Sequence, residues 1–171
     1  WILSFSTMMA IVFTCINIFK PEIHSKSLMP ALQSVWFVPH VAVYMFAYAM
    51  MGAATLFAIY LWWQSSRRKI QADEMTACDT LVKIGWAFLT LGMVMGSLWA
   101  KEAWGDYWTW DPKETWAAAT WLGYLLYMHI RRRLKDYDYT FALLIFNFIL
   151  LQMCWWGINF LPAAQSSVHV Y

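Results

Sequence analysis

Charge is scarce in this sequence. Of its 171 residues, 61% are hydrophobic and only 13% are Asp, Glu, Lys or Arg. A soluble domain of this length needs far more charge to cover its surface, so we expect the solvent of this chain to be lipid and its fold to be an all-α membrane helix bundle. The net charge of +2 is too small to argue for a nucleic-acid partner.

Cysteine is also rare. Cys15, Cys78 and Cys154 lie far apart, and neither CxxC nor CxxCH occurs. This spacing excludes a disulfide framework, a cysteine-based zinc site and a cofactor attached covalently to a CxxCH segment of the chain. We expect the three thiols to be apolar wall residues. The sequence also contains no nucleophile triad, no metal cage and no phosphate-binding loop.

Long runs without charge predict the membrane spans. A hydrocarbon core of about 30 Å needs about 20 apolar helical residues. The candidate spans are residues 1–19, 35–63, 84–100, 115–130 and 139–161. We therefore expect about five helices, because only helices pair the backbone groups of runs this long. Within the third candidate, Gly92 and Gly96 form a GxxxG step, which favours close packing of a neighbouring helix.

Lys and Arg predict the orientation of the bundle. Eight of them lie in or beside the connections that follow the second and fourth spans, and four lie on the opposite side. The eight are Arg67, Arg68, Lys69, Lys83, Arg131, Arg132, Arg133 and Lys135, and the four are Lys20, Lys26, Lys101 and Lys113. We therefore expect residues 20–34, residues 101–114 and the tail after Leu161 to face away from the cytoplasm.

The first apolar run is interpreted as a membrane span. It has no basic n-region and no small-residue cleavage site, so it does not resemble a signal peptide. The chain begins with Trp1 rather than Met, and both ends suggest a piece of a longer protein. We expect residues 1–171 to form a single membrane domain.

Tryptophan is the residue that stands out, with 13 copies. Six of them fall within residues 99–121, namely Trp99, Trp104, Trp108, Trp110, Trp116 and Trp121. An interfacial aromatic belt explains one or two at each helix end. It explains poorly four that lie in or beside one short loop, Trp104, Trp108, Trp110 and Trp116. We favour a platform for a flat apolar ligand whose edge stays in water.

The tryptophan-rich loop is predicted to end at a capped helix start. Asp111 is a good N-cap, Pro112 suits the first helical position, and Glu114 stands three residues after the cap. A capped N-terminus also presents free N–H groups and partial positive charge, which could hold a carboxylate of the ligand. Lys101 and Lys113 could assist, or could simply face water.

Residues 104–116, WGDYWTWDPKETW, resemble the WWD signature of the haem-handling membrane proteins. The continuation Pro-Lys-Glu-Thr-Trp after Asp111 is similar to the CcsA branch of the system II cytochrome c synthases, and differs from the CcmC and CcmF branches. The flanks agree: residues 24–34 followed by His40 resemble the segment before the family's first outer histidine. Residues 157–161 followed by His169 resemble the segment leading to its second.

The resemblance implies roles for three of the four histidines. It implies that His40 and His169 are axial ligands of the iron of haem b on the outer face, with Trp104, Trp108, Trp110, Asp111 and Trp116 around the haem. It also implies a second, inner haem site at His129, whose partner lies on an earlier helix outside this chain. Taken alone, His40 could bond a loop carbonyl, His169 could be a solvated loop residue, and His129 could anchor a helix end.

His129 cannot share a haem with the outer pair. It lies 17 residues after Pro112, which is about 25 Å along a helix axis. It is therefore expected near the cytoplasmic end of its span, just before Arg131. His24 lies in an expected outer segment, and we expect no ligand role for it.

The resemblance further implies a function, a location and partners. The family joins haem vinyl groups to the thiols of a CxxCH segment on apocytochrome c, as a cytochrome c haem lyase that works with a CcsB-type membrane partner. The expected location is the bacterial cytoplasmic membrane or the thylakoid membrane. Three alternatives remain. A haem exporter or chaperone would use the same residues, a b-type haem electron-transfer anchor would need a histidine pair at membrane depth, and a packing subunit without haem would leave the tryptophan-rich loop unexplained.

Overall fold

The computed structural model describes residues 30–134 and 137–162, together with six isolated helical positions between Thr7 and Phe19. The chain divides into two units, residues 1–33 and residues 34–171. In the first unit the structure describes a short 3-10 helix, η2 (Pro30–Gln33). The predicted first span, residues 1–19, and the histidines His24 and His169 therefore lie outside the described residues, apart from the six positions.

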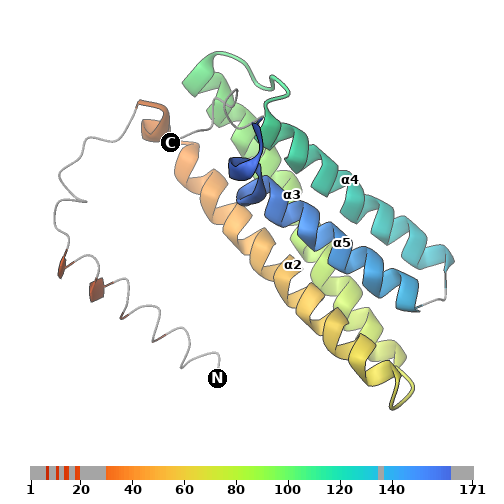
Figure 1. Ribbon diagram of the computed structural model, residues 1–171. Coiled ribbons are helices and arrows are strands. Elements are labelled where there is room, and N and C mark those ends of the chain that lie inside the picture. The colour runs from red at the N-terminus through yellow and green to blue at the C-terminus, as the bar shows by residue number, and fades with distance from the viewer. Residues whose placement is uncertain are drawn as a thin grey trace. The chain divides into compact units, whose positions relative to one another are not determined.

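The second unit contains four long helices (Figure 1). They are α2 (Phe37–Ser65), α3 (Ala72–Trp104), α4 (Pro112–Arg133) and α5 (Tyr137–Trp155), followed by the 3-10 helix η3 (Gly157–Phe160). α2 packs against α3 and α5, and α4 packs against α5 and α3. The described part of the chain is thus helical throughout its regular structure, as the sequence predicts.

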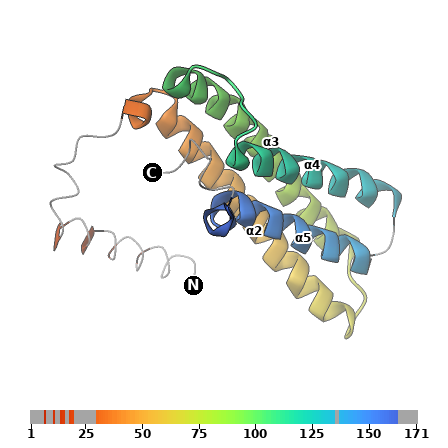
Figure 2. The same cartoon turned by 45° about the horizontal axis from the view of Figure 1, so that its top comes forward.

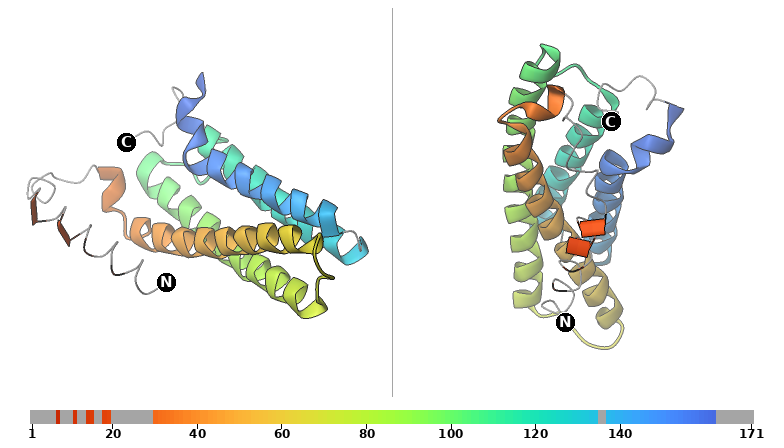
Figure 3. Two further views of the ribbon diagram at one scale, coloured as in Figure 1. Left: turned by 60° about the horizontal axis from the view of Figure 1, so that its bottom comes forward. Right: turned by 90° about the vertical axis from the view of Figure 1, so that its left-hand side faces the viewer.

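Successive helices run in opposite directions, so the bundle has two distinct ends (Figures 2 and 3). One end contains the loop of residues 105–111, which joins α3 to α4 and which we call the tryptophan loop. The other contains the connection of residues 66–71 and the end of α4 at Arg131, Arg132 and Arg133, and we call it the arginine end. The start of α2 and the end of α5 lie at the tryptophan-loop end.

Three helices among the described residues, α2, α3 and α5, are long and apolar enough to cross a membrane by length and composition. The fourth predicted span also forms a helix, α4, but is less apolar. α4 includes Lys113 and Glu114 in its first turn and three arginines in its last. The four helices therefore agree with a membrane helix bundle.

The two largest differences between the helix bounds and the charge-free runs are at the start of α3 and the end of α5. α3 begins at Ala72, twelve residues before Ile84, because Gln71 and Glu74 form a capping box that starts the helix there. A charge-free run marks where a helix can contact lipid, not where it begins. α5 ends at Trp155, and the next residues tighten into η3 before the predicted end at Leu161.

The interior of the bundle is built from one face of each helix. On α2 the buried positions recur every three or four residues, as one face of an α-helix requires: Ala47, Met51, Ala54, Ala58 and Leu61. Many large apolar side chains on the opposite faces are exposed, including Leu56, Leu91, Leu122, Phe146 and Ile149. An apolar exterior on helices this long is what a lipid solvent favours.

Polar side chains fix the register between α3 and α4. The Trp86 indole N–H donates to the Trp121 carbonyl at 3.2 Å, and the Trp121 indole N–H donates to Thr90 Oγ1 at 2.8 Å. Nearer the arginine end, the Tyr127 hydroxyl donates to Asp79 Oδ1 at 2.9 Å. Lipid offers these polar groups no hydrogen-bond partners, so the bonds between α3 and α4 are favoured. They hold the two helices, and the loop that joins them, in one alignment.

Candidate functional site

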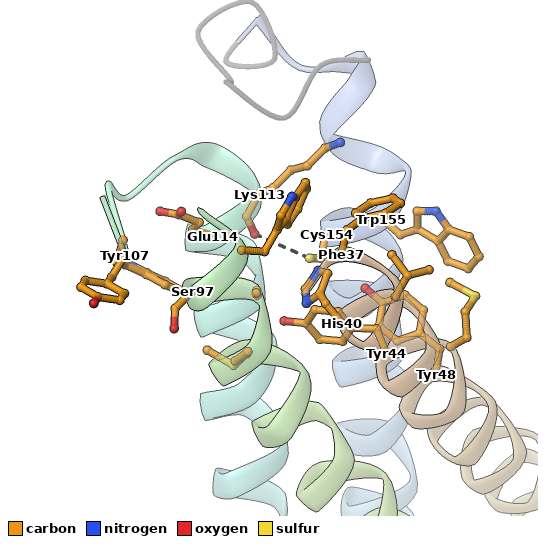
Figure 4. Close-up of a pocket in the computed structure, with 17 residues that line it drawn as sticks. Phe37, His40, Tyr44, Tyr48, Ser97, Tyr107, Lys113, Glu114, Cys154 and Trp155 are labelled. Carbon is orange, nitrogen blue, oxygen red and sulfur yellow. Dashed lines mark hydrogen bonds between the residues drawn. The ribbon is translucent and has the colours of Figure 1, made fainter. Parts of the chain in front are cut away.

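A cavity of about 270 Å³ lies at the tryptophan-loop end (Figure 4). All four helices and the loop contribute to its wall. Figure 4 shows His40 and Tyr44 on the α2 side and Tyr107 on the loop side. Most of the lining is aromatic or apolar, and it includes Phe37, Tyr44, Tyr48, Trp99, Tyr107, Trp108 and Trp155, with His40, Ser97, Lys113, Glu114 and Cys154 as the polar members.

His40 lies in the first turns of α2, and its ring orientation is defined by α3. Its Nδ1 lies 2.8 Å from the carbonyl oxygen of Gly92. A carbonyl can only accept, so Nδ1 donates, and in the neutral ring the basic lone pair is then on Nε2. This pattern, one ring nitrogen donating to a backbone carbonyl and the other basic, is the one that metal-bound histidines usually show.

Aromatic rings surround His40. The ring of Tyr44 lies edge-on at 4.6 Å between centroids, and that of Trp99 lies at 5.5 Å with an interplanar angle of 33°. Trp99 is only 4% exposed and also contacts Phe37 at 5.2 Å and Trp104 at 4.9 Å. The imidazole is therefore enclosed by flat apolar surfaces, and rotation of its ring would disturb several contacts.

The tryptophan loop is tied down at both ends. α3 stops at Gly105, which has a φ of 94° that favours glycine, and Lys101 Nζ donates to its carbonyl oxygen at 2.5 Å. At the other end, Glu114 Oε2 accepts from the backbone N–H of Thr109 at 2.8 Å and of Asp111 at 3.1 Å. One carboxylate thus fixes the last residues of the loop to the first turn of α4.

The predicted helix start is confirmed. Asp111 is the N-cap of α4, Pro112 is its first residue, and the capping box between Asp111 and Glu114 is present. Asp111 is 6% exposed, and its Oδ1 accepts from the backbone N–H of Lys113 at 2.9 Å. The carboxylate of Asp111 therefore caps α4, and Asp111 is not among the residues that line the cavity.

The structure separates the four tryptophans of the predicted platform. Trp108 lines the cavity, whereas Trp104 packs against Trp99, which is itself a lining residue. Trp110 is 69% exposed and stands at a left-handed φ of 58°, packing edge-on against Trp108 at 5.8 Å. Trp116 lies on α4, half-buried, away from the lining. Of the two loop tryptophans, Trp108 thus lines the cavity and Trp110 is exposed.

His129 lies near the arginine end of α4 and does not share the cavity. Its side chain is exposed, and its Nδ1 lies 2.8 Å from the carbonyl oxygen of Leu125 on its own helix. The structure therefore separates His40 from His129, as the helical distance predicts.

Several lining residues were not identified from the sequence. Tyr44 and Tyr48 follow His40 by four and eight residues on α2, so helical spacing from a candidate ligand could have found them. Cys154 and Trp155 lie at the end of α5, and the Cys154 thiol donates to the Lys113 carbonyl at 3.6 Å. They were missed because that helix was expected to continue to Leu161.

The arrangement suits a flat apolar ligand that is held at its face or edge. The cavity is near the lower limit of about 300 Å³ for pockets that enclose a small molecule, so a porphyrin-sized plate would be only partly enclosed. Its walls are aromatic, and one imidazole offers a basic nitrogen. Within the described ranges no three His, Cys, Asp or Glu side chains gather to hold a metal ion by themselves.

Comparisons with known proteins agree with this chemistry. The family model described as Cytochrome C assembly protein matches residues 1–164 of the chain. The chain is 31% identical to the cytochrome c biogenesis protein CcsA of Mesostigma viride, over 84% of the chain and 58% of that protein. It is 31% identical to CcsA of Prochlorococcus marinus (strain AS9601), over 94% of the chain and 62% of that protein.

A third relative is CcsA of Chlamydomonas reinhardtii, which is 34% identical over 91% of the chain and 46% of that protein. The chain therefore spans between about half and three fifths of the length of these relatives. A match over 84% or more of the chain necessarily includes the tryptophan loop, which lies well inside both ends.

Proposed function

The chain belongs to the cytochrome c assembly protein family, and from that premise we propose that it binds haem b in the aromatic cavity and presents it to apocytochrome c. Membership in the family gives the chain a role in cytochrome c biogenesis. The observation that carries the proposal is His40, whose Nδ1 donates to Gly92 and whose Nε2 is thereby the basic nitrogen beside the cavity.

In this proposal His40 supplies one axial ligand of the iron and His169 the other. Neutral imidazole is a common ligand of haem iron, and two imidazoles keep ferrous haem low-spin. Trp99 and Trp108 contact the porphyrin faces, while the exposed Trp110 extends the platform outward. Lys113, which lines the cavity, would donate to a propionate.

The reaction needs no nucleophile from this chain. A substrate cysteine S–H adds across a haem vinyl group: a C–S bond forms, the C=C double bond becomes single, and the thiol proton goes to the other vinyl carbon. Both reactants are consumed without an added oxidant or reductant. The protein contributes position, holding haem so that the two thiols of a CxxCH segment reach the two vinyl groups.

We further propose the finer topology and the assembly. Residues 1–19 and α4 complete five membrane spans, and the arginine end faces the cytoplasm, which leaves the cavity on the periplasmic or lumenal side. The membrane is the bacterial cytoplasmic membrane or the thylakoid membrane. His129 belongs to a second, inner haem site whose other ligand comes from outside this chain, and a CcsB-type protein is the partner.

The test is a visible spectrum with a pyridine haemochrome assay on the full-length protein in detergent. We expect non-covalent b-type haem in the wild type, loss of haem in His40→Ala and in His169→Ala, and recovery when imidazole is added. His24→Ala is the matched control and should keep its haem. Unchanged haem in both ligand variants would contradict the proposal and leave His129 as the candidate.

Haem delivery without bond formation would use the same residues. The Pro-Lys-Glu-Thr-Trp continuation favours the synthase. Production of holocytochrome c from a co-expressed apocytochrome separates the two functions, because a delivery protein would load haem without producing thioether bonds.

A further inference from the structure

The GxxxG step on α3 faces the candidate ligand. A Cβ atom built on Gly96 would lie 2.6 Å from Cε1 and 2.8 Å from Nδ1 of His40. A Cβ atom on Gly92 would lie 3.0 Å from Cδ1 of Tyr44. Because contacts under 3.0 Å do not occur in real structures, the imidazole can occupy its observed place only if residue 96 is glycine.

The missing side chain also gives the imidazole access to a helix carbonyl. Side chains on a helix lean toward its N-terminus and cover the turn before them. Without a side chain at Gly96, the carbonyl oxygen of Gly92 is open to the His40 ring, and Nδ1 approaches it to 2.8 Å. Nε2 lies farther from the Gly96 position than Cε1 or Nδ1, at 3.6 Å, which is an ordinary contact distance.

We propose that Gly96 is a positioning residue for the haem ligand: its lack of a side chain seats the His40 ring against α3, which fixes Nδ1 as donor to Gly92 and leaves Nε2 as the basic nitrogen. This inference rests on the proposed function, in which Nε2 of His40 binds iron. It adds that α3 sets the orientation of the His40 ring, and that a single methyl group at position 96 is enough to displace the ring.

Close helix packing is the alternative explanation for a GxxxG step. Two other glycines provide matched comparisons for the same Gly→Ala change. Gly85 is also tight, although less so than Gly96, and meets the Cγ atom of Met51 at 3.0 Å; Gly52 meets the ring of Phe148 at an ordinary 3.6 Å. Met51 can shift more readily than an imidazole held between aromatic rings, so Gly85→Ala reports packing strain without touching His40.

The first experiment needs no haem. Nitrogen-15 spectra of histidine-labelled full-length protein in detergent distinguish the two imidazole tautomers. We expect the Nδ1–H tautomer at His40 in the wild type and in Gly52→Ala, and a mixture in Gly96→Ala. An Nε2–H tautomer in the wild type would overturn the inference, whatever the variants do, so the test remains valid even if Gly96→Ala fails to fold.

The second experiment is haem titration followed by the visible spectrum. Loss of a group that orients a metal-bound histidine typically lowers affinity by about 10- to 100-fold. We expect a drop of that size in Gly96→Ala, with loss of the low-spin spectrum, partial recovery on adding imidazole, and little change in Gly52→Ala and Gly85→Ala. Wild-type affinity and spectrum in Gly96→Ala would contradict the inference.

A double variant separates this inference from the proposed function. If Gly96 acts through His40, adding Gly96→Ala to His40→Ala in the presence of imidazole should change affinity by less than about twofold, because the displaced ring is already absent. A full additional loss would assign Gly96 to packing and refute the inference. If His40→Ala alone leaves haem unchanged, the proposed function fails, and the tautomer measurement still decides what Gly96 does.

Discussion

The two histidines of the described helices are held in opposite ways. His40 donates to a carbonyl of a neighbouring helix, between aromatic rings, whereas His129 bonds its own helix and is exposed. A contact between helices fixes a ring relative to the bundle, but a contact four residues back fixes it only relative to its own helix. The orientation of His40 is therefore defined by the packing of the bundle, whereas that of His129 is not.

The largest contrast is expected when each histidine is removed in turn. His40→Ala should abolish haem binding at the tryptophan-loop end and the output of holocytochrome c, because the axial ligand is lost. His129→Ala should leave haem binding at the tryptophan-loop end close to the wild type, because His129 lies at the other end of the bundle. Equal losses in both variants, measured at matched protein concentration, would mean that the two ends do not act as separate sites.

Within the tryptophan loop, Trp108 should matter more than Trp110. Trp108 lines the cavity and Trp110 is 69% exposed. An aromatic contact contributes about 0.5–1.5 kcal/mol beyond the area it buries, so Trp108→Ala should lower haem affinity by about two- to tenfold. Trp110→Ala should lower it less. A reversed order in haem titrations would mean that the ligand lies on the outer face of the loop.

The hydrogen bonds between Glu114 and the tryptophan loop should be detectable by hydrogen exchange in the absence of haem. Glu114→Ala removes the acceptor of the Thr109 and Asp111 amides, at a cost of about 1 kcal/mol, typical of a lost cap. Hydrogen exchange at those two amides should accelerate by about fivefold. Glu102→Ala, which removes an exposed carboxylate at the same end, is the control. Protection that survives in Glu114→Ala would show that contacts other than the Glu114 carboxylate hold the loop.

The smallest effect on the site is expected from the arginine end. Tyr127→Phe removes the hydrogen bond to Asp79 and should lower the free energy of unfolding by about 1 kcal/mol. Haem affinity should stay at the wild-type value, because the cavity lies at the other end of the bundle. Thermal unfolding beside haem titration checks both parts, and a fall in affinity would reveal coupling along α3 and α4.

Much of the fold could be predicted from the sequence because lipid imposes it. Charge-free runs indicate helices, and a helix forms at each predicted span after residue 35. The capped start at Asp111 and Pro112 was also predictable, because capping depends on residues that are adjacent in sequence. The early start of α3 was not predictable in this way. Its first turns contain charged residues, and a charge-free run does not indicate how far a helix extends beyond the lipid layer.

The site was predictable only in part. His40 and Trp108 could be identified as site candidates from the sequence, and both line the cavity. The contribution of Trp99, Tyr44 and Gly96 depends on which faces of α2 and α3 meet, and that follows from packing between helices distant in sequence. The proposed role of Gly96 depends on its having no side chain where His40 packs. No sequence pattern shows that His40 lies opposite this glycine.

The length of α3 has a consequence for how reactants arrive. Its 33 residues span about 50 Å, well beyond a hydrocarbon layer of about 30 Å. The first twelve residues contain Asp73, Glu74, Asp79 and Lys83, so the surplus length is on the arginine side. In the proposed topology the lipid layer would begin near Ile84 and end near Lys101. Trp99 and the cavity would then lie at the boundary between lipid and water, where the proposed haem could arrive from the bilayer and the proposed peptide from water.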